Sequence, residues 1–431
     1  MDPDIKKIKR FREKERRFFR EINSENLLKN ILQIGSNALI VAVVNMAFQL
    51  LMSRKLGPVL YGELQTLLMI NTALLITVSA VGFVVARFVT YYKSRQQYDM
   101  MKFLANWSFI FFCMIGLAGF ILNIILSGIM AEFLYIDIFL IQLFGLLIWI
   151  SFMVPIIEGI LRGLQEFKFV GRYRLLDASL KLLLSGIMVF LGFKLDGVLA
   201  GLVVASTITI FFSGYILRKI YISKPHRINL KEIYKFTVPM FVACLSFSIM
   251  ASADMILVKH FFPGEMAGFY AAAGILAKVV LGLAFGSAGV MFPKVVEEYS
   301  NGNSKEAVKI LRNTLKINFI PGIIITLVFA LFPTYISRIV FGPQYNIDYM
   351  LSIYVVAMLF LSFSVVLLMY NLATKRYSFI NVFVIAAIVT VYQIVSFHAT
   401  IYAVVWALLV INGMLAGFMT WYNKKELFSR I

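Results

Sequence analysis

Apolar segments recur along the chain from about residue 31 almost to the C-terminus, and short stretches that carry Lys, Arg, Asp and Glu separate them. A transmembrane helix needs about 20 consecutive, mostly apolar residues. The pattern predicts an all-α polytopic membrane protein without a folded extramembrane domain. The twelve expected spans are 31–52, 64–92, 103–130, 137–162, 173–193, 196–217, 236–258, 267–292, 311–337, 348–373, 377–397 and 399–422.

The basic residues between these spans indicate an orientation. With the N-terminus in the cytoplasm, 33 of the 41 Lys and Arg residues fall in segments on the cytoplasmic side. An excess of Lys and Arg marks cytoplasmic loops, so we expect both termini inside the cell, in the cytoplasmic (inner) membrane. Five basic residues fall outside and three within spans; the outer ones are Arg54, Lys55, Lys194, Lys259 and Arg338, and the intramembrane ones Arg87, Lys181 and Lys278.

The two halves of the chain resemble each other. Residues 54–92 align with 260–298 without a gap at an offset of 206, which places Gly62 over Gly268. Six spans per half give both halves the same orientation, as in transporters with two six-helix lobes and a central cavity. The expected units are a cytoplasmic basic amphipathic tail (1–30), two lobes (31–217 and 236–422), a cytoplasmic linker (218–235) and a C-terminal tail (423–431).

Composition narrows the functional classes. The residues AVILMFWYC make up 61% of the chain and charged residues 15%, with a mean hydropathy of +0.85, which excludes an ordinary soluble domain. The net charge of +19 is accounted for mainly by the cytoplasmic segments, so we expect no nucleic-acid partner. Two cysteines and three histidines favour neither a disulfide framework nor a metal centre. We expect no cofactor and no metal, and no nucleotide-binding motif of the type GxxxxGK[ST] occurs.

Three motifs carry a family resemblance. RKLGPVLYGELQTL (54–67) joins the first two expected spans, and EGILRGLQEFKFVG (158–171) follows the fourth. The run from Asp254 through GFYAAAGILAKVV (268–280) to FPKV (292–295) is their second-lobe counterpart. Together they resemble the lipid-linked oligosaccharide (O-antigen type) flippases of the multidrug/oligosaccharidyl-lipid/polysaccharide exporter superfamily. The resemblance implies a V-shaped transporter that moves a polyprenyl-linked sugar to the outer leaflet by alternating access.

Lys278 is the most informative of the intramembrane charges. It lies about eleven residues into its span, roughly 16 Å along a helix at 1.5 Å per residue. An ionisable residue at this depth usually faces a cavity or a partner. One interpretation is a cavity cation that attracts phosphate, and the other is a structural pair with Asp254. Asp254 in turn has two interpretations: it holds Lys278, or it binds a coupling Na⁺ or H⁺ together with Ser248 and Ser252.

A second group of charges lies at the cytoplasmic side of the first lobe. Arg162 and Lys181 each follow an acid by four residues, Glu158 and Asp177, in the order that favours helical pairing. Their plain interpretation is a self-neutralised surface, and the alternative is substrate contact. Arg87 has no such neighbour in its own span, and a guanidinium offers bidentate geometry for phosphate. Arg87 is therefore the better candidate for capturing a pyrophosphate.

Polar and small residues inside the spans have ordinary structural uses. Asn45 and Gln49 form a short polar stripe that either contacts sugar hydroxyls or makes interhelical hydrogen bonds, which is the commoner case. The glycine motifs GVLAG (197–201) and GLAFG (282–286) are expected to allow close helix contacts for the same reason.

Other functions fit less well. A multidrug or organic-cation antiporter of the same superfamily would favour unpaired buried carboxylates, whereas here each deep acid has a basic residue in reach. A peptidoglycan-precursor flippase shares the architecture and stays an alternative. A membrane glycosyltransferase, polymerase or ligase needs an outer active site, and the expected outer loops are short, so we expect no enzyme. One chain already carries both lobes, so a monomer suffices.

Overall fold

The computed structural model describes residues 25–164, 166–217, 230–345 and 347–428, and every regular element in these ranges is a helix. Most of the predicted tail 1–30 and linker 218–235 lies outside the described residues. The first half of the chain comprises α2 (Glu25–Ser94), α3 (Tyr98–Leu134), α4 (Ile138–Ser151), α5 (Val154–Gly163), α6 (Phe167–Phe190) and α7 (Leu195–Leu217). The second half comprises α8 (Leu230–Phe261), α9 (Gly264–Ser300), α10 (Ser304–Leu331), α11 (Pro333–Val340), α12 (Asp348–Ala373), α13 (Ile380–Ser396), α14 (Ile401–Tyr422) and α15 (Lys424–Phe428).

Nine helices in the described ranges are long and apolar enough to cross a membrane. The chain is therefore a multi-pass helical membrane protein. Helix α2 contains the first two expected spans in one continuous element of 70 residues. Helices α6 and α13 coincide with expected spans but are not among the nine: α6 carries Arg174, Asp177 and Lys181, and α13 has only 17 residues. The number of twelve spans stays a prediction.

Helix α2 changes direction at Gly57. This residue has φ 73° and ψ 174°, outside the helical region, and a left-handed φ is readily adopted only by glycine. Pro58 follows, which disfavours helical geometry in the residue before it and suits the first turn of a new helix. The sequence pair Gly57-Pro58 thus separates the two parts of α2.

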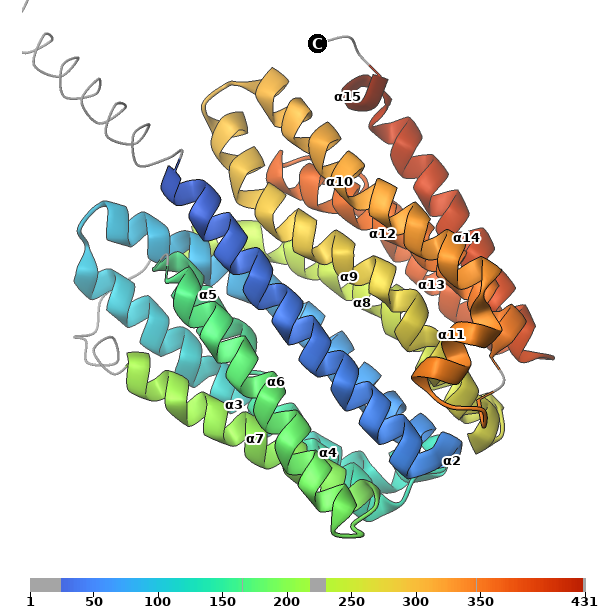
Figure 1. Cartoon of the computed structure of the whole chain (residues 1–431). Helices are drawn as coiled ribbons and strands as arrows, with labels where there is room; N and C mark the ends of the chain where they lie inside the picture. The colour runs from blue at the N-terminus through green and yellow to red at the C-terminus, as the bar shows by residue number, and fades with distance from the viewer. Residues whose placement is uncertain (1–24, 165, 218–229, 346, 429–431) are drawn as a thin grey trace, which may run out of the picture.

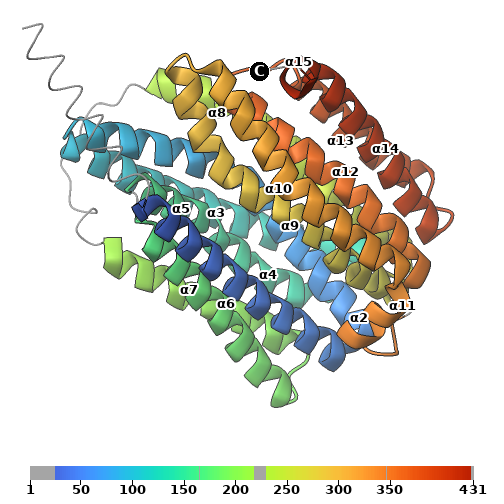
Figure 2. The same cartoon turned by 45° about the horizontal axis from the view of Figure 1, so that its top comes forward.

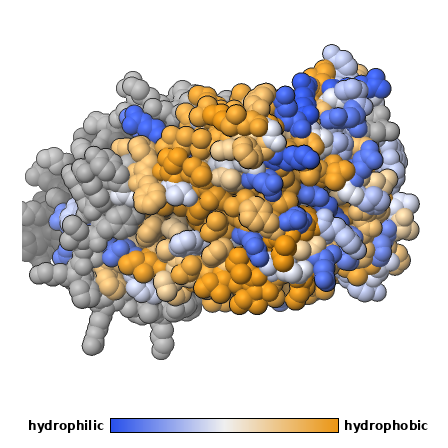
Figure 3. All heavy atoms as spheres, turned by 90° about the horizontal axis from the view of Figure 1, so that it is seen from below, coloured by the Kyte–Doolittle hydropathy of each residue, from blue (hydrophilic) through white to orange (hydrophobic). Residues whose placement is uncertain are grey.

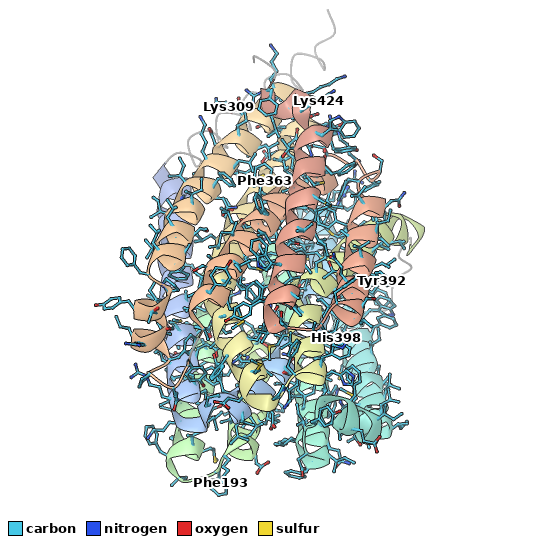
Figure 4. The ribbon with its side chains drawn as sticks, turned by 90° about the vertical axis from the view of Figure 1, so that its right-hand side faces the viewer. Phe193, Lys309, Phe363, Tyr392, His398 and Lys424 are labelled. Atoms are coloured by element: carbon cyan, nitrogen blue, oxygen red, sulfur yellow. The ribbon has the colours of Figure 1, made fainter. Side chains whose placement is uncertain are left out.

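The bundle has two distinct ends. Helix α2 begins and α15 lies at the same end (Figure 1), which we name the terminal end; Lys309 and Lys424 lie there (Figure 4). The opposite end holds the α6–α7 connection with Phe193, and His398 lies toward it (Figure 4). The turn in α2 at Gly57 belongs to that end (Figure 1), which we name the Gly57 end.

The two halves meet along α2, which packs against α8 and α9 in the middle of the bundle (Figure 2). The contact is closest near the Gly57 end. A Cβ atom placed on Gly268 of α9 would lie 2.0 Å from the Pro58 carbonyl oxygen, and one on Gly62 would lie 2.8 Å from the Gly268 nitrogen. Only residues without a side chain permit this approach. One continuous hydrophobic core extends from here into both halves.

The outer surface of the bundle is apolar. Hydrophobic side chains cover the middle of the face in Figure 3, and hydrophilic residues gather toward one side of the view. Exposed apolar side chains also occur on α3 and α10, among them Ile125, Ile129, Ile317 and Leu331, each more than two-thirds exposed. Apolar surface of this extent is expected where lipid replaces water as the solvent.

Candidate functional site

The candidate site centres on Lys278, which lies 14 residues after the first residue of the 37-residue helix α9. Its Nζ atom is 3.4 Å from Oδ1 of Asp254 on α8. The Asp254 side chain has no exposed surface, whereas that of Lys278 is 14% exposed. Tyr270 donates a hydrogen bond to Asp254 Oδ2 at 3.0 Å, and the Tyr354 hydroxyl on α12 donates to the same oxygen. The carboxylate is thus fully satisfied by three donors.

A small hollow of about 10 Å³ adjoins this pair, and both halves of the chain line it. Lys278 Nζ also lies 3.8 Å from the Met69 sulfur on α2 and 5.8 Å from the centre of the Tyr354 ring. Pockets for small ligands usually measure roughly 300–1,000 Å³. The hollow is far smaller than such a pocket and has room for about one water molecule.

The polar stripe on the first part of α2 faces the second part. The Gln49 Oε1 atom accepts hydrogen bonds from the Tyr61 hydroxyl at 3.1 Å and from Gln65 Nε2 at 2.6 Å. Gln65 lines the Lys278 hollow, and its own Oε1 atom is buried without a hydrogen-bond partner in the described residues. Asn45 is exposed. Gln49 thus acts as an interhelical hydrogen-bond acceptor that orients Gln65.

The two serines considered with Asp254 have other surroundings. The Ser248 hydroxyl donates to the Leu245 carbonyl and lies 3.1 Å from the Thr77 hydroxyl of the first half. The Ser252 hydroxyl is buried and has no hydrogen-bond partner in the described ranges. Asp254 accepts from Lys278 and two tyrosines, and within the described residues neither serine belongs to this hydrogen-bonded set.

The face of α9 that carries Lys278 is packed at one end of the helix and open at the other. Residues spaced by three or four lie on one side of a helix, which places Gly268, Lys278, Gly282, Gly286 and Gly289 on a common face. Gly268 contacts α2, but no described atom lies within 4 Å of a Cβ placed on any of the last three glycines. The expectation of close contacts for GLAFG is therefore wrong. Between Lys278 and the terminal end, this glycine face of α9 therefore has no closely packed neighbour in the described residues.

Charges gather at the terminal end of the first half around Glu158 of α5, which is 8% exposed. Its two carboxylate oxygens accept from Arg162 at 2.6 Å and from Arg174 at 2.6 and 2.8 Å. Lys181 pairs with Asp177 at 2.6 Å on α6. Both pairs expected from the four-residue spacing are present. Arg174 comes from another helix and gives the cluster of Glu158 and two arginines a net positive charge.

Arg87 is exposed on α2 and acts on the second half. Burial raises the pKa of the Tyr377 phenol, which lies in the connection between α12 and α13. The positive charge of Arg87 lowers this pKa and so partly offsets the effect of burial. Phe83, one turn earlier on α2, contacts Phe292 of α9 with ring centres 5.9 Å apart. The Arg162 guanidinium lies 5.6 Å from the Phe83 ring. Arg87 and Arg162 therefore both lie beside a contact between the halves.

Glu158→Gln is expected to destabilise the protein by about 2–3 kcal/mol. Removing one partner of a fully buried ion pair costs about 3–5 kcal/mol, and the partial exposure of Arg162 and Arg174 reduces that figure. Thermal unfolding in detergent measures the change. The control is Glu306→Gln, which removes an exposed Lys309 pair and should shift the Tm little. Equal shifts for both variants would contradict a structural role for the Glu158 cluster.

Sequence comparison with known families gives one match. The family described as "Polysaccharide biosynthesis protein" matches residues 27–298, more than half of the chain. The chain belongs to this family. Among curated proteins, none matches the chain in sequence.

Solved structures with the same fold are transporters. This polysaccharide biosynthesis family member is similar to an inward-facing multidrug resistance MATE transporter of the MOP superfamily, with 15% identity, a TM-score of 0.72 and coverage of 92% of this chain and 98% of the other. It is also similar to the outward-facing MATE structure, with 16% identity, a TM-score of 0.67 and coverage of 93% of this chain and 95% of the other. A third similar structure is a Pyrococcus furiosus MOP transporter that is described as having a binding pocket of reverse polarity. The identity is 18%, the TM-score 0.66, and the match covers 93% of this chain and 95% of the other. At 15–18% identity these matches show that the chain has the fold of these transporters.

Several residues of this family member's site were not expected from sequence. Tyr354 and Arg174 bind Asp254 and Glu158 from other helices, and Gln65 of α2 lines the hollow beside Lys278. Helical spacing reveals partners only within one helix, so no sequence signal pointed to them. In the described ranges, no cluster of His, Cys, Asp and Glu residues suited to a metal ion occurs.

Proposed function

We propose that this transporter moves a polyprenyl-linked, pyrophosphate-bearing oligosaccharide from the cytoplasmic to the outer leaflet by alternating access. The observation that carries the proposal is Lys278: a primary ammonium at mid-helix, beside a hollow lined by both halves. A cation held at this depth suits a phosphate group that must pass through the membrane. The family match to polysaccharide biosynthesis proteins supports a saccharide as the cargo.

The burial of Asp254 favours an anionic over a cationic substrate. An antiporter for organic cations needs a carboxylate that its substrate reaches. Asp254 has no exposed surface and accepts from Lys278, Tyr270 and Tyr354, whereas Lys278 retains an exposed edge. An arriving phosphate therefore meets the ammonium first. The two tyrosines keep Asp254 hydrogen-bonded when Lys278 turns toward the substrate.

The open face of α9 supplies a path from the terminal end to Lys278. Packed halves near Gly268 and open space at Gly282 to Gly289 support a V-shaped arrangement that opens at the terminal end. Arg87 and Arg162 lie at that end between the halves, where we assign them the first contact with the pyrophosphate. Lys181 is paired with Asp177 and has a secondary part.

Helix boundaries support twelve spans in two lobes, 31–217 and 236–422, related by a parallel repeat. The part of α2 after Gly57 (58–94) and α9 (Gly264–Ser300) are both 37 residues long, and their ends are offset by 206 residues. The first residues of α3 and α10, Tyr98 and Ser304, keep this offset. The predicted equivalents Gly62 and Gly268 touch each other, as residues beside a two-fold axis do. With the terminal end cytoplasmic, both termini lie inside.

The remaining partners follow from the same proposal. The cargo is the lipid-linked oligosaccharide, membrane lipids surround the apolar surface, and a monomer holds both lobes. H⁺ and Na⁺ remain candidate coupling ions, and Asp254 is the residue that would bind one of them. We assign Ser248 and Ser252 no part in binding that ion. A peptidoglycan-precursor flippase remains the second candidate because its cargo carries the same pyrophosphate.

The lipids of cells depleted of this protein test the proposal. Mass spectrometry should show accumulation of one polyprenyl-pyrophosphate saccharide, and its sugar names the cargo; a peptidoglycan precursor would favour the second candidate. Complementation with Arg87→Ala should leave most of the lipid accumulated, while Lys309→Ala, an exposed cation at the same end, should restore the normal level. If no such lipid accumulates and the cells become sensitive to cationic dyes, an antiporter replaces the flippase.

A further inference from the structure

A second buried ion pair lies at the Gly57 end, between the two halves. Lys259 in the last turn of α8 has its Nζ atom 3.4 Å from Oε1 of Glu63 on α2. The exposed fractions of the two side chains are 4% and 13%. Sequence analysis placed Lys259 on the outer side of the membrane and gave it no partner; in the structure it is almost fully buried. The Lys278 pair differs in that both its partners belong to the second half.

The surroundings make this ion pair part of a closed contact. Glu63 directly follows Gly62, whose backbone touches Gly268. The Asp137 carboxylate at the start of α4 acts electrostatically on Glu63, which concentrates negative charge of the first half around the lysine of the second. Burying two charges is costly, so a pair placed at a contact that never opened would gain little over apolar residues.

Further hydrogen bonds join the halves around the pair. The Tyr345 hydroxyl donates to the Ser53 carbonyl at 2.9 Å, and Arg54 donates to the Ile339 carbonyl at 2.5 Å. His260, next to Lys259, has Nδ1 2.8 Å from the Phe133 carbonyl. At the other end of α9 the corresponding face is open at Gly286. The halves are thus tightly joined at the Gly57 end, whereas toward the terminal end the glycine face of α9 is open, although Phe83 still contacts Phe292.

We propose that Glu63 and Lys259 form the latch of the outer gate: a positioning pair whose separation allows the Lys278 site to open at the Gly57 end. This inference rests on the proposed alternating access. An ion pair suits a latch because both charges regain hydration when the contact opens, whereas exposed apolar residues would oppose opening. The pair holds the closed state without preventing its release.

Distances between spin labels test the latch without any substrate. Labels at Phe193→Cys and Phe397→Cys, in a background of Cys113→Ser and Cys244→Ala, report separation of the halves at the Gly57 end. Glu63→Gln leaves Lys259 buried without its counter-charge, and we expect the population at longer distance to rise several-fold. Glu63→Leu/Lys259→Met, which has no charge to hydrate, should show only the short distance. Glu306→Gln, at an exposed Lys–Glu pair within one helix, should match the unsubstituted protein.

An unchanged distribution in Glu63→Gln, or a longer distance in Glu63→Leu/Lys259→Met, would overturn the latch. The apolar variant keeps the test decisive if Glu63→Gln does not fold, because matched apolar replacements of a buried pair usually preserve stability. The distances do not depend on the cargo. If the distance distribution shifts in Glu63→Gln but depleted cells accumulate no lipid, the latch is supported and the flippase is rejected. If the distribution is unchanged but the lipid accumulates, the flippase is supported and the latch is rejected.

Discussion

Lys278→Met should abolish transport and also destabilise the protein, by about 3–5 kcal/mol. The loss of stability arises because Asp254 has no exposed surface and loses its counter-charge. The double variant Lys278→Met/Asp254→Asn removes both charges and leaves an amide that still accepts from Tyr270 and Tyr354. We expect it to regain most of the stability and none of the transport. Thermal unfolding and transport of a lipid-linked oligosaccharide in liposomes measure the two effects.

This pair of variants separates the two roles of Lys278. If the lysine served only to neutralise Asp254, the double variant would transport normally, and Lys278 would not be a substrate residue. Lys309→Met is the matched control, since it removes a lysine that is 58% exposed at the terminal end. It should change neither quantity, because exposed pairs contribute little.

Gly268→Ala and Gly286→Ala should have opposite effects on stability, although both glycines lie on the same face of α9. A Cβ on Gly268 would lie 2.0 Å from the Pro58 carbonyl oxygen, so the halves must move apart where they are most tightly packed. We expect a loss of about 1–3 kcal/mol, as for other overpacked contacts. Gly286 faces open space, and alanine there should stabilise the helix by up to about 1 kcal/mol. Thermal unfolding of both variants measures the difference.

A larger side chain tests the path. Gly286→Trp meets no described atom at its Cβ and should fold like the unsubstituted protein. It would occupy the open face of α9 that we propose as the path to Lys278, and it should strongly reduce transport. The control is Lys294→Trp, near the terminal end of α9. Gly302→Trp, in the α9–α10 turn, is less suitable because it would add backbone strain at φ 81°. Full transport by Gly286→Trp would exclude the α9 face as the path.

The charge pairs show what helical spacing predicts well. Glu158–Arg162 and Asp177–Lys181 follow from a separation of four residues within one helix, and both are present. The Lys278–Asp254 pair was one of two interpretations, based on neighbouring spans, and the distance of 3.4 Å makes it an ion pair. Arg174 lies 16 residues after Glu158 on another helix. No local pattern brings those two together.

The glycine motifs show the limit of local pattern. GVLAG and GLAFG have the same spacing of small residues, and close helix contacts were expected for both. In the first motif a Cβ on Gly201 would lie 2.7 Å from the Ser185 nitrogen, whereas Gly282 and Gly286 of the second face open space. A glycine permits a close contact but does not create one; the neighbouring helix must be there.

Sequence alone determined that this chain is a multi-pass helical membrane protein, because lipid requires long apolar helices whatever their arrangement. It also identified the family through the order of its motifs, and the charges buried in its helices. The tertiary structure decided which of those charges meet, that Lys259 is buried between the halves, and that α9 is packed at Gly268 and open at Gly286. Those outcomes depend on contacts between helices distant in the chain, and hydropathy along the chain carries no information about them.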